Sequence, residues 1–133
     1  MKIKFLFFFF FTVPLFLFSQ VHKYKAVSYS AKFKNASTWG KWSEAERTDI
    51  LVSINFDDAK IKIYSKETQL YDIVSIKDKI TDDEGDDIFS MYCEDADGMN
   101  CYVDIYKLHS QNGRLQLYVR YSDMQWLYNL VSQ

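Results

Sequence analysis

The stretch that most constrains the fold of this chain is residues 101–131, CYVDIYKLHSQNGRLQLYVRYSDMQWLYNLV. Apolar and polar residues alternate along three runs, which Asn112-Gly113 and Ser122-Asp123 separate as turn-forming pairs. Alternation with a period of two is typical of a half-buried β-strand, so the stretch predicts three consecutive antiparallel strands. Three strands with one apolar face need further strands to bury it, and we expect the earlier part of the chain to supply them.

The rest of the chain shows the same alternation in five more segments. We expect these to form strands over residues 27–33, 50–56, 61–63, 69–76 and 88–93. A sequential run of about eight antiparallel strands leaves two exposed edges, and closure into a barrel removes both. The pattern therefore predicts an all-β, up-and-down antiparallel meander that forms a small closed or half-closed calycin-like barrel. A two-sheet β-sandwich is the alternative, because the connections 34–48 and 77–87 could each cross between sheets.

Matching of apolar faces also predicts the register between neighbouring strands. At the first turn, a two-residue loop would oppose apolar to polar residues and turn one strand inside out. A three-residue loop over residues 111–113, with Gly113 left-handed, keeps the faces matched. This loop opposes Ile105 to Val119, and the next turn then opposes Val119 to Trp126.

The same criterion applies to the first half of the chain. It opposes Ile54 to Ile63 and Ile63 to Tyr71. It also places Lys62 opposite Asp72 on the outer face, where an exposed ion pair contributes about 0.2–1 kcal/mol. The connections between these strands are short polar turns.

Residues 1–19 are predicted to be a secretory signal peptide. Two lysines precede an almost unbroken apolar run over residues 5–18, which ends at Ser19. The run has 14 residues, short of the roughly 20 that a membrane-spanning helix needs. We therefore expect cleavage after Ser19, a single β domain over residues 20–133, and no membrane span in the mature chain. A periplasmic or secreted location follows.

The charge and motif content of the expected mature chain argue against several functions. It holds 14 basic and 18 acidic residues, a net charge of −4, which gives no support to nucleic-acid binding. His22 and His109 belong to no catalytic set, and Gly-x-Ser-x-Gly, His-Glu-x-x-His and phosphate-loop motifs are absent. We therefore expect a protein that is not an enzyme and needs no cofactor.

The two cysteines predict a structural disulfide. Cys93 and Cys101 lie on adjacent predicted strands, opposed across a seven-residue loop, in a domain expected to be exported. A disulfide that closes so small a ring would contribute roughly 2–3 kcal/mol. The alternative is a pair of buried free thiols. A catalytic redox pair is not expected, because the Cys-x-x-Cys spacing is absent.

Acidic residues concentrate in two loops, which hold nine of the 18 between positions 78 and 97. The run Asp95-Ala-Asp97-Gly98 resembles the start of a calcium loop, although the full 12-residue pattern is missing. The composition favours a solvated acidic rim, and calcium binding is the alternative. The ligands in that alternative would be Asp82, Asp83, Asp86, Asp95 and Asp97.

Several tyrosines fall on the face opposite the apolar one. The predicted registers place Asp104 opposite Arg120 and Tyr106 opposite Tyr118 on this outer face. Cross-strand aromatic pairs stabilise a sheet by under about 1 kcal/mol each. Because tyrosine is also enriched at interfaces, the same residues form a candidate interaction surface. Its members are Tyr102, Asp104, Tyr106, Tyr118 and Arg120.

The segments DADGMNCYVDIYKL, NGRLQLYVRYSD and WLYNL, with the upstream WGKWSE, support a resemblance. Together they resemble small exported proteins of unknown function from Bacteroidetes-type bacteria, over about residues 39–131. The resemblance implies a small periplasmic or secreted β-protein. It supplies no catalytic residues.

The function that we expect is a non-enzymatic binding or interaction module, whose partner is a protein, a glycan or a small molecule. The alternative is a calycin-like carrier of a small hydrophobic ligand. The barrel interior discriminates between them, because a filled interior leaves no room for cargo and a sealed, dry cavity of a few hundred Å³ favours the carrier. The side chains expected to face inward are Val27, Phe33, Ile54, Phe89, Val103, Val119 and Trp126.

Overall fold

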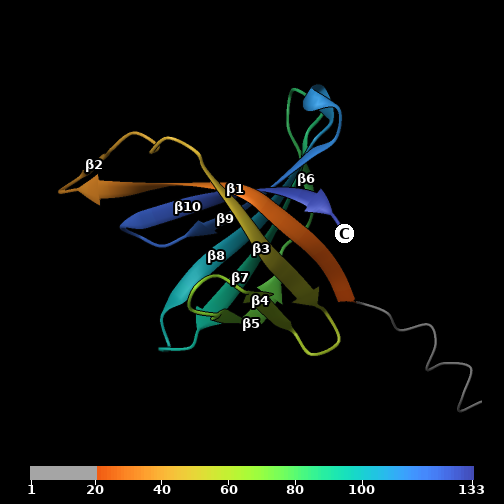
Figure 1. The fold of residues 1–133 in the computed structure, drawn as a ribbon, viewed down its shortest axis with the longest axis horizontal. Helices are drawn as coiled ribbons and strands as arrows, with labels where there is room; N and C mark the ends of the chain where they lie inside the picture. The colour runs from red at the N-terminus through yellow and green to blue at the C-terminus, as the bar shows by residue number, and fades with distance from the viewer. Residues whose placement is uncertain (1–20) are drawn as a thin grey trace, which may run out of the picture.

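The computed structural model describes residues 21–133, which form ten β-strands and one short 3-10 helix (Figure 1). In chain order these are β1 (Val21–Asn35), β2 (Thr38–Trp39), β3 (Glu46–Asn55), β4 (Lys60–Ile63), β5 (Gln69–Ile76), β6 (Ile80–Thr81), β7 (Asp87–Asp95), β8 (Asn100–Leu108), η1 (His109–Gln111), β9 (Arg114–Arg120) and β10 (Met124–Ser132). The predicted signal peptide, residues 1–19, lies outside the described residues. Within residues 21–133, no helix has the length and apolar character that crossing a membrane requires.

Eight of the strands form a closed antiparallel barrel, and the chain visits them in spatial order. The order is β1-β3-β4-β5-β7-β8-β9-β10, and β10 pairs back with β1 to close the sheet. The short strands β2 and β6 lie outside this circuit and pair with β1 and β7. The predicted all-β, up-and-down, calycin-like barrel is therefore confirmed, and the chain does not form the alternative two-sheet sandwich.

Strand β1 is the longest element and makes the closure. It pairs with β10 on one side and β3 on the other, and a β-bulge between Ala26 and Ser28 interrupts both ladders. The bulge leaves Val27 out of register, so Ala26 is buried while Val27 is 37% exposed. Phe33, near the end of the strand, is 61% exposed. The prediction that Val27 and Phe33 face the interior is therefore wrong.

Aliphatic side chains from the wall strands fill the middle of the barrel. The most completely buried are Val52, Ile54, Ile61, Ile63, Met91, Val103, Leu117 and Val119. Strand alternation sends these residues inward and the intervening residues outward. Each buried aliphatic side chain stabilises the fold by about 1.5–3 kcal/mol relative to an exposed one. The middle of the barrel is thus a packed core.

The registers divide into two groups. Cys93 opposes Cys101 and Val119 opposes Trp126, as predicted. Between β8 and β9, however, Ile105 opposes Leu117 and not Val119. The reason is the connection: residues 109–113 form a five-residue loop that contains η1 and has Gly113 in the left-handed region. The predicted three-residue loop is therefore wrong, although Gly113 has the predicted conformation.

The registers of β3, β4 and β5 also differ from prediction by two residues. Ile54 opposes Ile61, and Ile61 opposes Tyr71. A shift of two keeps every apolar side chain on the same face, so the core composition is unchanged. On the outer face, Asp72 therefore pairs with Lys60, at 2.6 Å, in place of the predicted Lys62.

Cys93 and Cys101 oppose each other across β7 and β8 as predicted, but both are free thiols, so the predicted disulfide is wrong. The Asp95 N–H donates to the Met99 carbonyl at 2.8 Å, and pair types alternate from there, which makes Cys93–Cys101 a hydrogen-bonded pair. Side chains in such pairs lie farther apart than the roughly 3.8 Å between Cβ atoms that a disulfide needs. Burial raises the pKa of Cys93 to about 12 and that of Cys101 to about 11.

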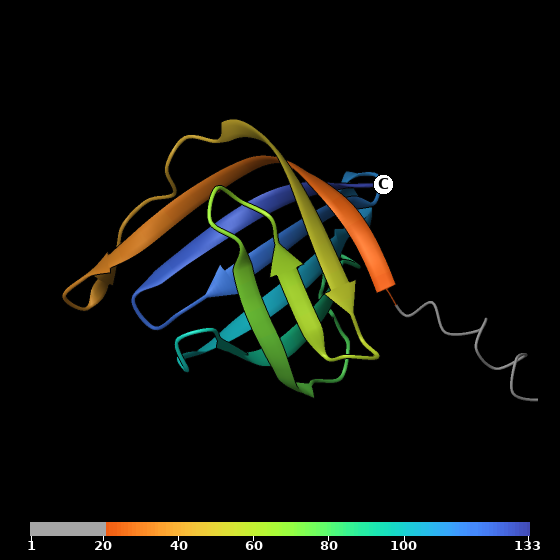
Figure 2. The same cartoon turned by 60° about the horizontal axis from the view of Figure 1, so that its bottom comes forward.

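The two ends of the barrel carry different connections (Figure 2). The open end holds the start of β1, the end of β10 and the connections 56–59, 77–86 and 109–113. The closed end holds the connections 36–45, 64–68, 96–99 and 121–123. Apolar side chains surround a cavity at the open end, and hydrogen-bonded tyrosine and glutamine side chains seal the closed end.

Candidate functional site

The open end contains a cavity of about 530 Å³. Residues from β1, β3, β5, β7, β8, β9 and β10 line it, so most of the barrel wall contributes. The apolar lining includes Ile54, Phe56, Ile76, Phe89, Met91 and Leu115. Both the volume and the apolar walls are typical of small-molecule sites, which measure about 300–1,000 Å³.

The cavity has a buried floor and an exposed rim. Ile54 and Met91 form part of the floor, and each is only 1% exposed because the packed core lies beneath them. At the rim, Phe89 is 39% and Ile76 is 60% exposed. Large apolar side chains that remain in water at the mouth of an apolar cavity favour a ligand that covers them.

Two basic side chains, Lys107 and His22, also line this cavity. The His22 ring packs edge-on against Phe56, with ring centroids 5.5 Å apart. Lys107 lies opposite Asp87 across β7 and β8, but the Asp87 carboxylate instead binds His109 at 2.9 Å and Thr81 at 2.8 Å. Among the described residues, Lys107 has no ion-pair partner, so its ammonium is available to a bound anion.

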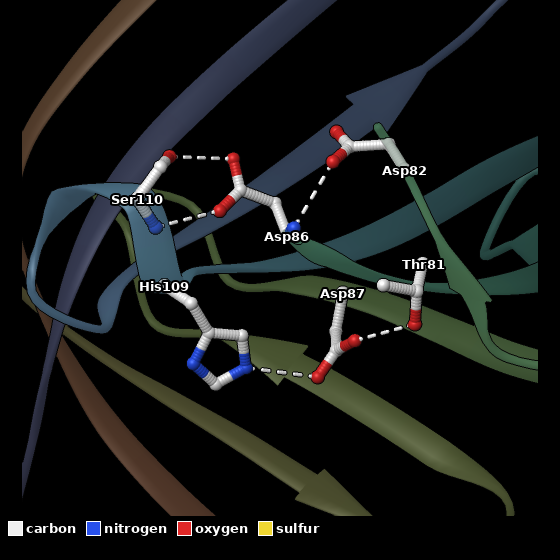
Figure 3. Close-up of polar contacts among 6 residues, drawn as sticks. All are labelled: Thr81, Asp82, Asp86, Asp87, His109 and Ser110. Carbon is white, nitrogen blue, oxygen red and sulfur yellow. Dashed lines mark hydrogen bonds and ion pairs between the residues drawn. The ribbon is translucent and has the colours of Figure 1, made fainter. Parts of the chain in front are cut away.

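The first acidic loop is fastened to η1 beside this mouth (Figure 3). The backbone N–H and the hydroxyl of Ser110 both donate to the Asp86 carboxylate, each at 2.8 Å. Asp86 is only 4% exposed, and its own N–H donates to Asp82 at 3.0 Å. The hydrogen bond from His109 lowers the pKa of Asp87 below its usual value. These contacts hold one side of the mouth in place.

The five predicted calcium ligands do not come together. Carboxylate oxygens of Asp82, Glu84 and Asp86 lie within 4.8 Å of one another at the open end. Asp95 and Asp97 lie at the other end of β7, which at about 3.3 Å per residue is a separation of some 25–30 Å. Asp83 is exposed and is not part of the group.

Asp95 has a structural task at the closed end. One of its carboxylate oxygens accepts from the N–H groups of Asp97 and Met99, both at 2.9 Å, and the other accepts from the Tyr121 hydroxyl at 2.7 Å. The Tyr121 hydrogen bond in particular lowers the pKa of Asp95. The resemblance to a calcium loop at this position is therefore accounted for by turn chemistry.

The predicted interaction surface forms a second packed layer on the outside of the barrel. Asp104 is only 1% exposed, and Arg120 covers it with two hydrogen bonds, one of them at 3.2 Å. The Asp104 carboxylate raises the pKa of Arg120. Arg120 in turn lies over the Tyr102 ring, at 4.9 Å from its centroid. Asp104 is thus a buried anchor with no surface to offer a partner.

Tyr106 and Tyr118 complete this layer. Their ring centroids are 4.7 Å apart, and Trp42 packs edge-on against Tyr118 at 6.0 Å. Burial raises the pKa of both tyrosines. The predicted direct pairs Asp104–Arg120 and Tyr106–Tyr118 are wrong, because Asp104 opposes Tyr118 and Tyr102 opposes Arg120. The two-residue shift makes the predicted partners diagonal neighbours, so all five residues still lie together on the outer face. Trp42 returns from the β2–β3 connection and packs on Tyr118.

Side chains seal the closed end of the barrel with hydrogen bonds. The Gln69 amide donates to the hydroxyls of Tyr128 and Ser65, both at 3.1 Å. The Tyr71 hydroxyl donates to the Gln69 carbonyl oxygen at 2.6 Å. Tyr71 and Tyr128 are 3% and 4% exposed, so this plug is itself buried.

The lining of the open end is the part of the site that sequence reasoning missed. Phe56, Ile76 and Leu115 are not among the side chains expected to face inward, and they lie at or next to strand ends, above the packed layer. A usable signal was present in Ile76 and Phe89. Both flank the long polar connection 77–86, where the barrel end is left uncovered.

Comparisons with protein-family models, with curated proteins and with solved structures find no match to this chain. No residue role is therefore available from a relative. The assignment of the open end as the candidate site rests on its geometry, and the resemblance to exported Bacteroidetes-type proteins stays a prediction.

Proposed function

We propose that this protein is a non-enzymatic carrier that binds a small amphipathic molecule, with an apolar chain and an anionic head group, in the open end of its barrel. The cavity of about 530 Å³ carries this proposal. The filled middle of the barrel leaves no room for a ligand there, but this cavity lies above the packed core. It is open at its rim, and so differs from the sealed cavity expected for a calycin-like carrier. An open mouth suits a ligand whose head group stays in water.

The apolar part of the ligand would replace water on the walls. Each CH₂ group buried against such walls contributes about 0.8 kcal/mol. The exposed rim side chains Ile76 and Phe89 would be covered by the same ligand. The driving force for binding is therefore the removal of apolar surface from water, on both the ligand and the rim.

The polar end of the ligand would lie beside Lys107. This lysine lines the mouth and has no ion-pair partner among residues 21–133, whereas its nearest acidic neighbour across the strands, Asp87, is engaged by His109 and Thr81. A carboxylate or phosphate is the head group that an ammonium binds best. A fatty-acid-like monocarboxylate is the simplest molecule that meets both requirements.

The tyrosine-bearing outer face supports an interaction module less well than the cavity supports a carrier. Asp104 is buried there, and Trp42 packs on Tyr118. Because Asp104 and Arg120 already form an ion pair with each other, they would contribute little binding free energy to a complex with a partner.

Displacement of a fluorescent fatty-acid analogue by dodecanoate tests the proposal. Leu115→Trp places an indole in the mouth, and we expect it to weaken dodecanoate binding by at least about tenfold. Leu70→Trp adds the same bulk at a residue that is 43% exposed and away from the cavity, so binding should be unchanged. Equal affinity in the two variants would contradict the proposal.

The head-group assignment has its own test. Lys107→Met keeps an apolar stem and removes the ammonium. Dodecanoate should bind this variant more weakly by about tenfold, since a charge-assisted hydrogen bond is worth roughly 1.5–3 kcal/mol. Dodecanol, which has no charge, should bind the variant and the unaltered protein equally. An equal loss of affinity for dodecanoate and dodecanol would show that Lys107 does not bind the head group.

A further inference from the structure

The hairpin at the far end of β1 projects from the barrel (Figures 1 and 2). Lys34 pairs with Trp39 and Asn35 with Thr38, so β1 and β2 form a two-stranded tip. The Gly40 N–H donates to the Phe33 carbonyl at 2.8 Å and extends the pairing. The tip therefore presents its side chains outward on two faces.

The charge of this hairpin differs from that of the whole domain. Residues 32–42, KFKNASTWGKW, hold three lysines and no acidic residue, although residues 20–133 carry a net charge of −4. The Lys32 ammonium lies 5.3 Å from the Trp39 ring and 4.7 Å from the Trp42 ring. Lys34 lies 5.7 Å from Trp39, and Lys41 is exposed. Basic and aromatic side chains are thus interleaved along the tip.

The other face of the tip carries Phe33. At 61% exposure it is the most exposed large apolar side chain in the described part of the chain. An isolated exposed leucine or valine needs no explanation, but Phe33 lies between two lysines and next to β2, which carries the half-buried Trp39. The tip combines apolar surface with positive charge at a single projecting point.

The tip is fastened to the barrel wall. The Ser43 N–H donates to the Ala31 carbonyl at 2.7 Å, and the Ala31 N–H donates to the Ser43 hydroxyl at 2.9 Å. Trp42 packs against Tyr118 on the wall. A hairpin held in this way loses little conformational freedom when it binds, so its exposed groups are preorganised.

We propose that this hairpin docks the protein on an anionic lipid bilayer. Phe33 and Trp39 would enter the boundary between head groups and acyl chains, where aromatic side chains are favoured. Lys32, Lys34 and Lys41 would bind lipid phosphates and carboxylates, which attract basic side chains near the surface. A bilayer fits better than an acidic protein, because Phe33 and Trp39 lie on opposite faces of the tip. A bilayer can surround both faces, whereas the surface of a folded protein would contact only one.

This inference goes beyond the proposed carrier function and is independent of it. The hairpin and the cavity lie at opposite ends of β1, and Tyr24 of the cavity lining and Lys34 of the hairpin are ten residues, or about 33 Å of strand, apart. A protein docked by the hairpin would hold the mouth of its cavity away from that bilayer.

Vesicle co-sedimentation tests the docking, with the expected mature chain over residues 20–133. We expect binding to 3:1 phosphatidylcholine–phosphatidylglycerol vesicles, and little binding to pure phosphatidylcholine. Lys34→Gln with Lys41→Gln should weaken binding by about 25-fold, since each lysine contributes about fivefold near an anionic surface. Lys23→Gln with Lys79→Gln removes the same charge at the open end and should weaken binding by less than about threefold.

Phe33→Ser tests the apolar contribution separately. We expect it to weaken binding by about tenfold at constant salt, with no change in the salt dependence. Brominated lipid should quench tryptophan fluorescence in the unaltered protein, and about tenfold more of it should be needed for the same quenching in this variant.

Equal binding by the two lysine pairs, or equal binding to neutral and anionic vesicles, would overturn the proposal. Absence of vesicle binding would also overturn it. Retention of the protein on immobilised polyglutamate would then point to an acidic protein as the partner.

Discussion

The two ends of this barrel are built from the same eight strands and yet have different chemistry. At the closed end, Tyr71, Tyr128 and Gln69 bind one another across the interior. At the open end, the corresponding inward residues are Phe89 and Leu115, which have no polar groups to bind across the gap. At the closed end, hydrogen bonds between polar side chains fill the space across the barrel. At the open end, apolar side chains make no such bonds, and a cavity remains between them.

The largest expected difference concerns the two thiols, which lie towards the closed end. With the pKa of Cys93 raised to about 12, its thiolate at neutral pH is about a thousandfold scarcer than that of a free cysteine. We expect a disulfide-exchange reagent to label neither cysteine in the folded protein and both after unfolding in urea. A cysteine placed at the open end, Ser132→Cys, should react at once. Rapid labelling of Cys93 or Cys101 in the folded state would show that the closed end is not sealed.

The second test compares two leucines on β9. Leu117 is fully buried in the packed core, whereas Leu115 lines the cavity two residues away on the same face. Leu117→Ala should lower the free energy of unfolding by about 3 kcal/mol or more. Leu115→Ala should lower it by less than about 1.5 kcal/mol, because part of its surface is already next to empty space. Urea denaturation midpoints measure both, and similar losses would mean that the cavity collapses in solution.

The third test opens the plug. Gln69→Ala removes the amide that bonds Tyr128, Tyr71 and Ser65, and leaves buried hydroxyls without partners. We expect a loss of about 1–3 kcal/mol in the free energy of unfolding. Gln116→Ala, on the outer face, removes an amide that donates to Asn129 and accepts from the Tyr118 hydroxyl, both at 3.1 Å. Because both partners are only half-buried, it should cost less than about 1 kcal/mol. If the two costs were equal, the plug would contribute nothing beyond an ordinary surface contact.

The smallest expected effect is acid sensitivity, which both ends share. Asp95 at the closed end and Asp87 at the open end have pKa values below normal, chiefly through hydrogen bonds from Tyr121 and His109. A lowered folded-state pKa stabilises the protein above the unfolded value of about 3.9, and that contribution is lost as pH falls through the folded pKa.

Thermal unfolding between pH 7 and pH 2.5 measures this effect. Tyr121→Phe removes the main hydrogen bond that lowers the pKa of Asp95, so its melting temperature should fall less between pH 7 and pH 2.5 than that of the unaltered protein. Asp97→Asn, at an exposed position on the same turn, should leave this fall unchanged. A fall that is identical in all three proteins would exclude Asp95 as a contributor.

The sequence predicted the barrel because inside and outside alternate strictly along each strand. It predicted two registers correctly and three others two residues out of place, and the physical reason is the period of two. A pairing of Ile105 with Leu117 or with Val119 buries the same faces, so alternation cannot distinguish them. Only the turn decides, and the turn at η1 holds five residues where the sequence pattern favoured three.

The candidate site was less predictable for a different reason. Whether Leu115 covers a core or lines a cavity depends on what faces it from strands far away in the chain. The disulfide failed similarly, because the distance between Cys93 and Cys101 depends on the kind of pair they form in the ladder. Alternation shows which face of the sheet a residue occupies. It does not show how deep in the barrel Leu115 lies, or how far apart the side chains of Cys93 and Cys101 are.

The closure of β1 on β10 has a consequence for the order in which the chain can fold. Tyr24 opposes Ser132, and Phe33 opposes Met124, so the first and last strands meet only when the whole domain is present. Every other wall pairing joins strands that are neighbours in sequence, and these can form as hairpins. Until its final residues emerge, a nascent chain therefore exposes an unpaired edge on β1 and on β9. Pairing over so great a sequence distance makes closure the slow step, and the time before it is when the chain is most open to aggregation.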